Sequence, residues 1–196
     1  MTRLEFSVTL VSVALTATIH NLSIELADVD RGVYEKFDLR VARHPSETLE
    51  YMLTRVLAYC LEYADGIQLT EGVAAIDEPA VKIRDLTGKI TAWIEVGVPG
   101  PDRLHRGLKF AGRAAVYTHR DARKLMKDLE AAGIARLSEV PVYTFARNLI
   151  EDISELLASR RNTLSLSITE RELYIDVDGR TFNSTILEHR TGTGSK

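Results

Sequence analysis

Apolar and polar residues alternate along the chain from residue 16, and this alternation predicts two β-strands. The segment 16–43 contains TATIHNLSIELADVD and YEKFDLRVARH. Asp28, Asp30 and Gly32 separate the two stretches, and residues of these types are typical of a turn. We therefore expect an antiparallel pair of strands near the N-terminus.

A helical period follows this pair of strands. Apolar residues recur every three or four positions over three turns, which predicts an amphipathic helix. The stripe consists of Leu49, Met52, Leu53, Val56, Leu57, Cys60 and Leu61. Pro45 suits the first helical position, and Glu47 suits the first turn, where a negative charge complements the helix dipole.

Strands and helices then alternate through the middle of the chain. VKIRDLTGKITAWIEV predicts a hairpin with its turn at Thr87 and Gly88. A helix is expected from Asp102, with a row of residues directed inward: Leu104, Leu108, Ala111 and Ala115. The strand AVYTH, the helix DARKLMKDLEAAG and the strand VPVYTF come next. This order is typical of parallel strands with helical crossovers.

The C-terminal part predicts a helix at about 146–159, a closing hairpin in NTLSLSITERELYIDVDG, and a mobile polar tail over 190–196. The chain contains no internal repeat, no low-complexity stretch and no linker rich in proline or serine. We therefore expect residues 1–196 to form a single α/β domain, with a mixed α+β sheet flanked by helices.

Composition narrows the class of protein. The chain has 196 residues, 45% hydrophobic, which is enough for one domain with a full core. A net charge of -3 argues against a protein that coats nucleic acid, while it leaves room for local basic patches. Cys60 is the only cysteine, which excludes an internal disulfide and fits a buried thiol in a reducing compartment. The apolar N-terminal run is interrupted by serine and threonine and is too short for a membrane span, so we expect a cytoplasmic protein.

Acidic residues surround the predicted hairpin. Asp77 and Glu78 precede Pro79, and Asp85 lies near the hairpin turn. Glu95 lies near the C-terminal end of the strand ITAWIEV, where open α/β sheets bind their ligands. Carboxylate oxygens are the ligands that Mg²⁺ prefers. Either these acids hold a divalent ion, or Asp77, Glu78 and Pro79 form a surface turn and an arginine neutralises Glu95.

The stretch GPDRLHRGLKF supplies candidate arginines. Arg103 and Arg106 share one face of the predicted helix, close to the end of the Glu95 strand. They could neutralise that glutamate, stabilise a phosphate, or face solvent. Glu47 also has two possible roles: it could reach a metal site, or it could only stabilise the start of the helix. The chain lacks glycine-rich phosphate loops, a nucleophile elbow and CxxC pairs, and its histidines are scattered. Sites for a dinucleotide, for a nucleoside triphosphate, for serine-hydrolase chemistry and for zinc are therefore not expected.

Several sequence motifs occur together in an order that is specific to one family: RHPSETLEYMLTRVLAY, DEPAVKIRDLTGKITAWIEVGVP, an R-x-x-R pair and AAVYTH. They resemble the YaeQ family of bacterial proteins over residues 17–188, and residues 1–15 look like an extension of the usual start. The resemblance implies a variant of the PD-(D/E)XK nuclease fold, a mixed sheet flanked by helices, here with extra N- and C-terminal hairpins. In such nucleases acidic residues bind Mg²⁺, and the lysine of (D/E)-x-K helps to activate water.

The resemblance also implies roles for the acidic residues of this chain. Glu95 corresponds to the (D/E) acid and Glu47 to a helix glutamate. Asp77 corresponds to the first aspartate, because it belongs to the DEP word, and Asp85 remains an alternative for that role. The implied cofactor is Mg²⁺ or Mn²⁺, with no organic cofactor.

The lysine position of the motif falls on Gly97. The resemblance offers Arg106 as the replacing cation, with Lys109 further along. Arginine stays charged near neutral pH, so it can hold a phosphate but hardly activates water. Three hypotheses follow: a Mg²⁺-dependent phosphodiesterase on nucleic acid, a non-catalytic module that binds nucleic acid or a transcription-related protein, and a purely structural network of acids and arginines. No membrane partner is expected.

Overall fold

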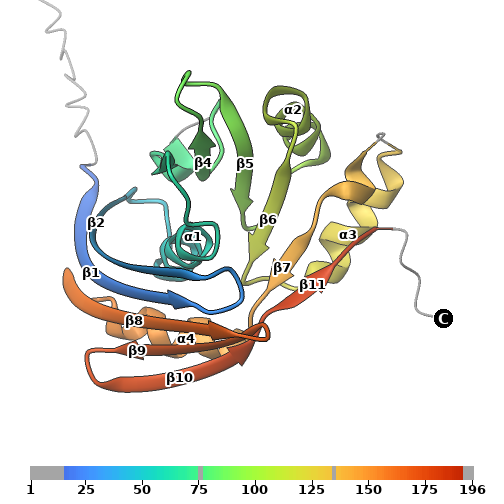
Figure 1. Cartoon of the computed structure of the whole chain (residues 1–196). Helices are drawn as coiled ribbons and strands as arrows, with labels where there is room; N and C mark the ends of the chain where they lie inside the picture. Colours follow the sequence, from blue (N-terminus) through green and yellow to red (C-terminus); the bar gives the residue numbers. More distant parts are fainter. Residues whose placement is uncertain (1–15, 75–76, 134–135, 192–196) are drawn as a thin grey trace, which may run out of the picture.

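The computed structural model describes residues 16–74, 77–133 and 136–191, which form two β-sheets with helices between and beside them (Figure 1). Residues 1–15 and 192–196, assigned above to an extension and to the end of the tail, lie outside the described residues.

The first sheet is built from the two ends of the chain. Its strands, in spatial order, are β10 (Arg180–Thr185), β9 (Glu172–Val177), β8 (Arg161–Thr169), β1 (Thr18–Asp28) and β2 (Val33–Arg43). Neighbouring strands are antiparallel except β1 and β8, which are parallel.

The predicted terminal hairpins therefore exist, but they form a sheet of their own. The core-facing residues of β1 and β8 are Leu22, Ile24, Leu26, Leu164, Leu166 and Ile168. Because both strands alternate apolar and polar residues, pairing them side by side buries both apolar faces at once.

The second sheet contains, in spatial order, β11 (Leu187–His189), β7 (Val142–Thr144), β6 (Ala114–Thr118), β5 (Ile90–Val96), β4 (Val81–Arg84) and β3 (Ile67–Leu69). β5, β6 and β7 run parallel, which confirms the predicted crossovers. β4 and β5 form the predicted antiparallel hairpin.

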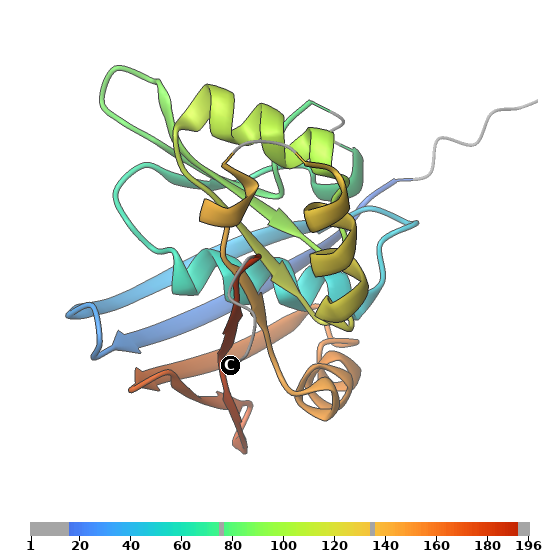
Figure 2. The same ribbon diagram turned by 90° about the vertical axis from the view of Figure 1, so that its right-hand side faces the viewer.

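Helices cover both faces of the second sheet. They are α1 (Leu49–Leu61), α2 (Pro101–Ala111), α3 (Ala122–Ala131) and α4 (Arg147–Leu156), with short 3₁₀ turns η1 (Gly72–Ala74) and η2 (Leu137–Glu139). α1 lies between the two sheets with α4 beside it (Figure 1), and these elements enclose the larger core. α2 and α3 lie on the other face of the second sheet, over a smaller core (Figure 2). Because α1 is enclosed by both sheets, even Thr54 and Arg55 are buried.

The start of α1 differs from the prediction. Thr48 caps the helix, because its Oγ1 accepts a hydrogen bond of 3.2 Å from the backbone N–H of Tyr51. The first helical residue is therefore Leu49. Pro45 and Glu47 both precede the cap, so the predictions that placed them in the first turn are wrong.

Other boundaries also move. α2 ends at Ala111 and is capped by Gly112, which has the left-handed φ of 77° that favours glycine. Ala115 therefore lies in β6 instead of the helix. Arg190 is held in place, because its Nη1 donates to the carbonyl of Glu139 at 3.2 Å. Within the described ranges, no helix combines the length and apolar character that crossing a bilayer requires.

Candidate functional site

Glu95 is the next-to-last residue of β5, and its carboxylate is buried beneath α2. Trp93, two residues earlier on the same face of the strand, donates from Nε1 to Glu95 Oε1 at 2.6 Å. Arg103 Nε lies 2.7 Å from the same oxygen. The residue is only 3% exposed. Burial raises the pKa of Glu95, and the hydrogen bonds and charge from Arg103 and Trp93 partly offset that rise.

The approach of α2 to the sheet depends on Gly107. A Cβ atom at this position would lie 2.5 Å from Trp93 Cδ1, so a larger residue would push the helix away. The close approach places Arg103, one turn earlier, over Glu95. The same guanidinium also donates to the carbonyl of Glu78, which ties the loop before β4 to the helix.

The loop before β4 carries the predicted first aspartate. Asp77 Oδ1 lies 2.9 Å from Arg106 Nη1, and the Asp77 side chain is 85% exposed. The carboxylate of Glu78 pairs with Lys82, a mostly buried residue of β4. Asp77 and Glu95 thus both lie along α2, but each carboxylate contacts an arginine of its own. Arg106, the expected phosphate ligand, is directed at Asp77.

Glu47 lies in the loop before α1 and forms a buried ion pair. Its Oε1 accepts from Arg55 Nη1 at 2.7 Å, and its Oε2 accepts from the backbone N–H of His44 at 3.2 Å. Arg55 also donates to the carbonyl of Thr70 at 2.6 Å. Neither side chain of the pair is exposed by more than 1%. The sequence analysis did not single out Arg55, because this residue lies on the helix face opposite the apolar stripe of α1, where an arginine is ordinarily exposed to solvent.

Asp85 lies at the opposite end of β5 from Glu95. Its Oδ1 accepts from the N–H and hydroxyl of Thr87 at 2.8 and 2.6 Å, and from the N–H of Lys89 at 3.1 Å. The side chain therefore shapes the hairpin turn. A strand rises about 3.3 Å per residue, so the length of β5 up to Glu95 is roughly 16 Å. The structure does not bring these two carboxylates together.

Gly97, the position at which the nuclease resemblance expects a lysine, has a backbone geometry that favours glycine. Gly97 has a φ of 84°, and a Cβ there would lie 3.2 Å from Cε2 of Tyr51. A lysine at this position would be strained in its backbone and crowded by the ring. Burial raises the pKa of Tyr51 to about 12; Glu47 and Glu95 both add to the rise, while their arginines oppose it. Tyr51 therefore lies near both buried ion pairs.

This donor set does not fit a Mg²⁺ or Mn²⁺ ion. Such ions need several oxygen ligands of net negative charge. Here Glu95, Glu47 and Asp77 each contact a guanidinium of the chain. Across residues 16–74, 77–133 and 136–191, no three side chains of His, Cys, Asp or Glu are grouped closely enough to hold a metal. A divalent ion would have to displace the arginines before it could bind.

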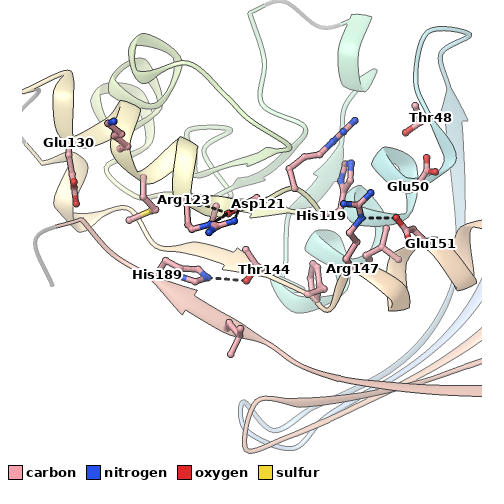
Figure 3. Close-up of a pocket in the computed structure, with 17 residues that line it drawn as sticks. Thr48, Glu50, His119, Asp121, Arg123, Glu130, Thr144, Arg147, Glu151 and His189 are labelled. Atoms are coloured by element: carbon pink, nitrogen blue, oxygen red, sulfur yellow. Dashed lines mark hydrogen bonds and ion pairs between the residues drawn. The ribbon is translucent and has the colours of Figure 1, made fainter. Parts of the chain in front are cut away.

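Two adjoining cavities open where the parallel strands end. The smaller, about 600 Å³, is lined by residues that include Glu47, Tyr51, Gly97 and Lys124. The larger, about 1000 Å³, lies between α1, α3, α4 and β11 (Figure 3). The residues that line both are Thr48, His119, Arg120 and Asp121. Open α/β sheets bind their ligands at this end of the strands.

A family model described as YaeQ protein matches residues 13–186 of the chain. The chain belongs to the YaeQ family. This match confirms the resemblance to the YaeQ family that the sequence motifs indicated. The Uncharacterized protein YaeQ of Escherichia coli (strain K12) is 32% identical over 167 residues, which cover 84% of this chain and 91% of that protein. Its counterpart in Salmonella typhi is 32% identical over 164 residues, which cover 83% of this chain and 90% of that protein.

Solved YaeQ structures have the same fold. The crystal structure of YaeQ protein from Pseudomonas syringae superposes with a TM-score of 0.82 at 28% identity, covering 91% of this chain and 97% of that one. YaeQ protein from Xanthomonas axonopodis pv. citri gives a TM-score of 0.81 at 27% identity, covering 90% and 99%. The mixed α+β architecture with flanking helices is thus the fold of the YaeQ family.

Proposed function

We propose that this YaeQ-family chain binds nucleic acid at the carboxyl ends of β5, β6 and β7 and does not cleave it. One observation carries the proposal. The three acids that the nuclease resemblance assigns to a metal, Glu95, Glu47 and Asp77, each have an arginine within 2.7, 2.7 and 2.9 Å respectively. A carboxylate neutralised in this way attracts a divalent ion weakly, and Gly97 removes the lysine that would help to activate water.

The fold supports nucleic acid as the ligand by analogy. A mixed sheet flanked by helices, with Glu95 in a central strand and the DEP word just before β4, agrees with the arrangement that the PD-(D/E)XK resemblance implies. Because a fold by itself does not determine function, the chemistry of the surface has to support the same ligand.

Cations at this end of the sheet provide that chemistry. The sequence HRDARKLMK, which follows β6, contains four cations and one acid. The cationic residues are Arg120, Arg123, Lys124 and Lys127, all exposed and all lining one or both cavities. In a chain of net charge -3, a local cluster of this kind suits contact with a few phosphates rather than coating of a long duplex.

Fluorescence anisotropy with labelled single- and double-stranded DNA and RNA tests the proposal. We expect binding in EDTA that weakens with salt. For single strands, the slope of log K against log salt should be about -0.7 per phosphate contacted. The double variant Arg120→Gln, Lys124→Gln should flatten this slope by about 1.4. Arg180→Gln, on edge strand β10 of the other sheet, serves as the matched control and should change nothing.

Gels of the same strands after incubation with Mg²⁺ or Mn²⁺ test the absence of cleavage. We expect intact strands. Cleavage that requires either metal and disappears in Glu95→Gln would overturn the proposal in favour of a nuclease. Failure to bind any of the strands would also overturn it, and a transcription-related protein would become the partner to test.

A further inference from the structure

The larger cavity has the size and position of a small-molecule site. It begins directly after two parallel strands, with His119 and Arg120 following β6 and Phe145 following β7, and α4 and β11 close its far side (Figure 3). Its volume of about 1000 Å³ is at the upper end of the range usual for ligand pockets. A nucleoside phosphate fits within that space.

Two arginines of this cavity have donors available for a ligand. Arg120 has no side-chain hydrogen bond or ion pair within the described part of the chain. Arg147 uses Nε for its 2.8 Å bond to Glu151, and its two terminal amino groups make no further bond to the described residues. Arg123, in contrast, is held by Asp121 through Nε at 2.8 Å and Nη2 at 2.5 Å. Arg120 and Arg147 are therefore the groups that can bind a phosphate.

Acids on the same walls limit how much negative charge the cavity accepts. Four carboxylates line it together with its four arginine and lysine side chains: Glu50, Asp121, Glu130 and Glu151. The cavity is thus close to neutral, and the placement of its groups has to select the ligand. A ligand with one phosphate and an otherwise uncharged body suits this balance better than a polyphosphate does.

His119 presents a hydrogen-bond acceptor at the junction of the two cavities. The hydroxyl of Thr54 lies 2.7 Å from the carbonyl of Glu50, to which it can only donate. Its oxygen therefore accepts the 3.1 Å bond from Nδ1–H of His119. Burial lowers the pKa of His119, so the ring is neutral near pH 7, with a lone pair on Nε2. A hydroxyl or amino group of a ligand can donate to that atom.

One part of the lining is apolar, and we call it the apolar wall. It consists of Met126, Phe145, Ile150 and Leu187; Thr48, Thr144 and His189 are the other polar residues of the lining. An apolar, partly aromatic surface can pack against the flat face of a nucleobase. Stacking of this kind does not depend on which base is present, since every base has such a face.

From these contacts we infer that the larger cavity binds one nucleoside phosphate. Arg120 and Arg147 hold the phosphate, the apolar wall holds the base, and His119 Nε2 accepts from a hydroxyl or amino group. The inference deepens the proposed function and rests on it, since it names the unit of nucleic acid that is held most closely. That unit comes either from a free mononucleotide or from the phosphorylated end of a strand.

Calorimetric titration with AMP, adenosine and inorganic phosphate tests the site. AMP should bind, and adenosine should bind about tenfold more weakly because it lacks the charged acceptor. Arg120→Gln and Arg147→Gln should each weaken AMP binding about tenfold without changing the melting temperature. His119→Phe should weaken AMP and adenosine alike. Arg180→Gln, remote from the cavity, should leave all affinities unchanged.

Oligonucleotides of one sequence, with and without terminal phosphates, distinguish the two sources. Stronger binding of phosphorylated ends assigns the cavity to strand ends, and AMP binding without that gain assigns it to free mononucleotides; both results support the inference. Absence of AMP binding, or AMP binding unchanged in both arginine variants, would overturn it. If strands bind regardless of end phosphates while AMP does not, only this inference fails. If AMP binds and no strand does, the proposed function fails instead.

Discussion

Replacing Glu47 by glutamine tests whether this carboxylate is a structural partner of Arg55. The two side chains are buried, and their charged atoms lie 2.7 Å apart. Glutamine keeps the shape but removes the negative charge, which leaves a buried guanidinium without a counter-charge. The two carboxylate oxygens accept from different donors, Arg55 Nη1 and the backbone N–H of His44, so the NH₂ group of glutamine would face one of these donors and could not accept its hydrogen bond.

The expected loss is large because both groups are desolvated. Removing one partner of a buried ion pair costs about 3–5 kcal/mol. Folded domains are stable by about 5–15 kcal/mol, so the variant should lose a substantial share. For a chain of this size, 1 kcal/mol shifts the melting temperature by about 2–4 °C, which gives a decrease of roughly 6–20 °C.

Urea unfolding, followed by the fluorescence of the single tryptophan, measures the change. The double variant Glu47→Gln, Arg55→Met should recover much of the loss, since it also removes the unpaired charge. Glu25→Gln breaks an exposed pair with Lys36 and should cost less than about 1 kcal/mol. A Glu47→Gln protein as stable as wild type, or more stable, in metal-free buffer would refute the reasoning. That result is expected of an acid held in place for a metal.

Three buried residues outside the ion pairs give further expectations. Burial, and after it the charge of Arg43, lowers the pKa of His20 in the folded state. As the pH falls below about 6.5, the unfolded state therefore binds a proton at this histidine before the folded state does. The contribution to stability should be complete above that pH and should decline below it. His20→Gln should flatten part of this decline in urea midpoints measured from about pH 5 to 8, and an unchanged slope would argue against it. Gly107→Ala would place a Cβ atom against Trp93 and should cost about 1–3 kcal/mol, so wild-type stability would contradict the packing. Burial raises the pKa of Cys60 to about 12, so Ellman's reagent should label it only on unfolding; rapid labelling of the native protein would show otherwise.

The periodic patterns were sufficient for most local elements. Alternation predicted β1 and β2, and the helical stripe predicted α1, because each period follows from which face is buried. The pairing of β1 with β8 was not predicted, since it joins segments from opposite ends of the chain and local periodicity carries no information about partners. The start of α1 was wrong because Thr48, a better cap, competed with the proline signal.

For the candidate site, the sequence predicted where the acidic residues lie along the strands better than it predicted their ion-pair partners. Glu95 lies near the end of its strand as expected, and Arg103 was one of its two candidate partners. The pairing of Glu47 with Arg55 depends on burial between two sheets, which no local pattern reveals. The distance between Asp85 and Glu95 was predictable in principle, because an extended strand separates them. The cavities were not predictable, since they form from loops that follow separate strands.

Calorimetric titration of the wild-type chain with Mn²⁺ tests most directly whether arginines, and not a metal ion, neutralise the acids Glu95, Glu47 and Asp77. We predict no saturable heat in the millimolar range, and traces for wild type and Glu95→Gln that superimpose. A one-site isotherm for wild type that disappears in Glu95→Gln would contradict the assignment and restore the nuclease hypothesis.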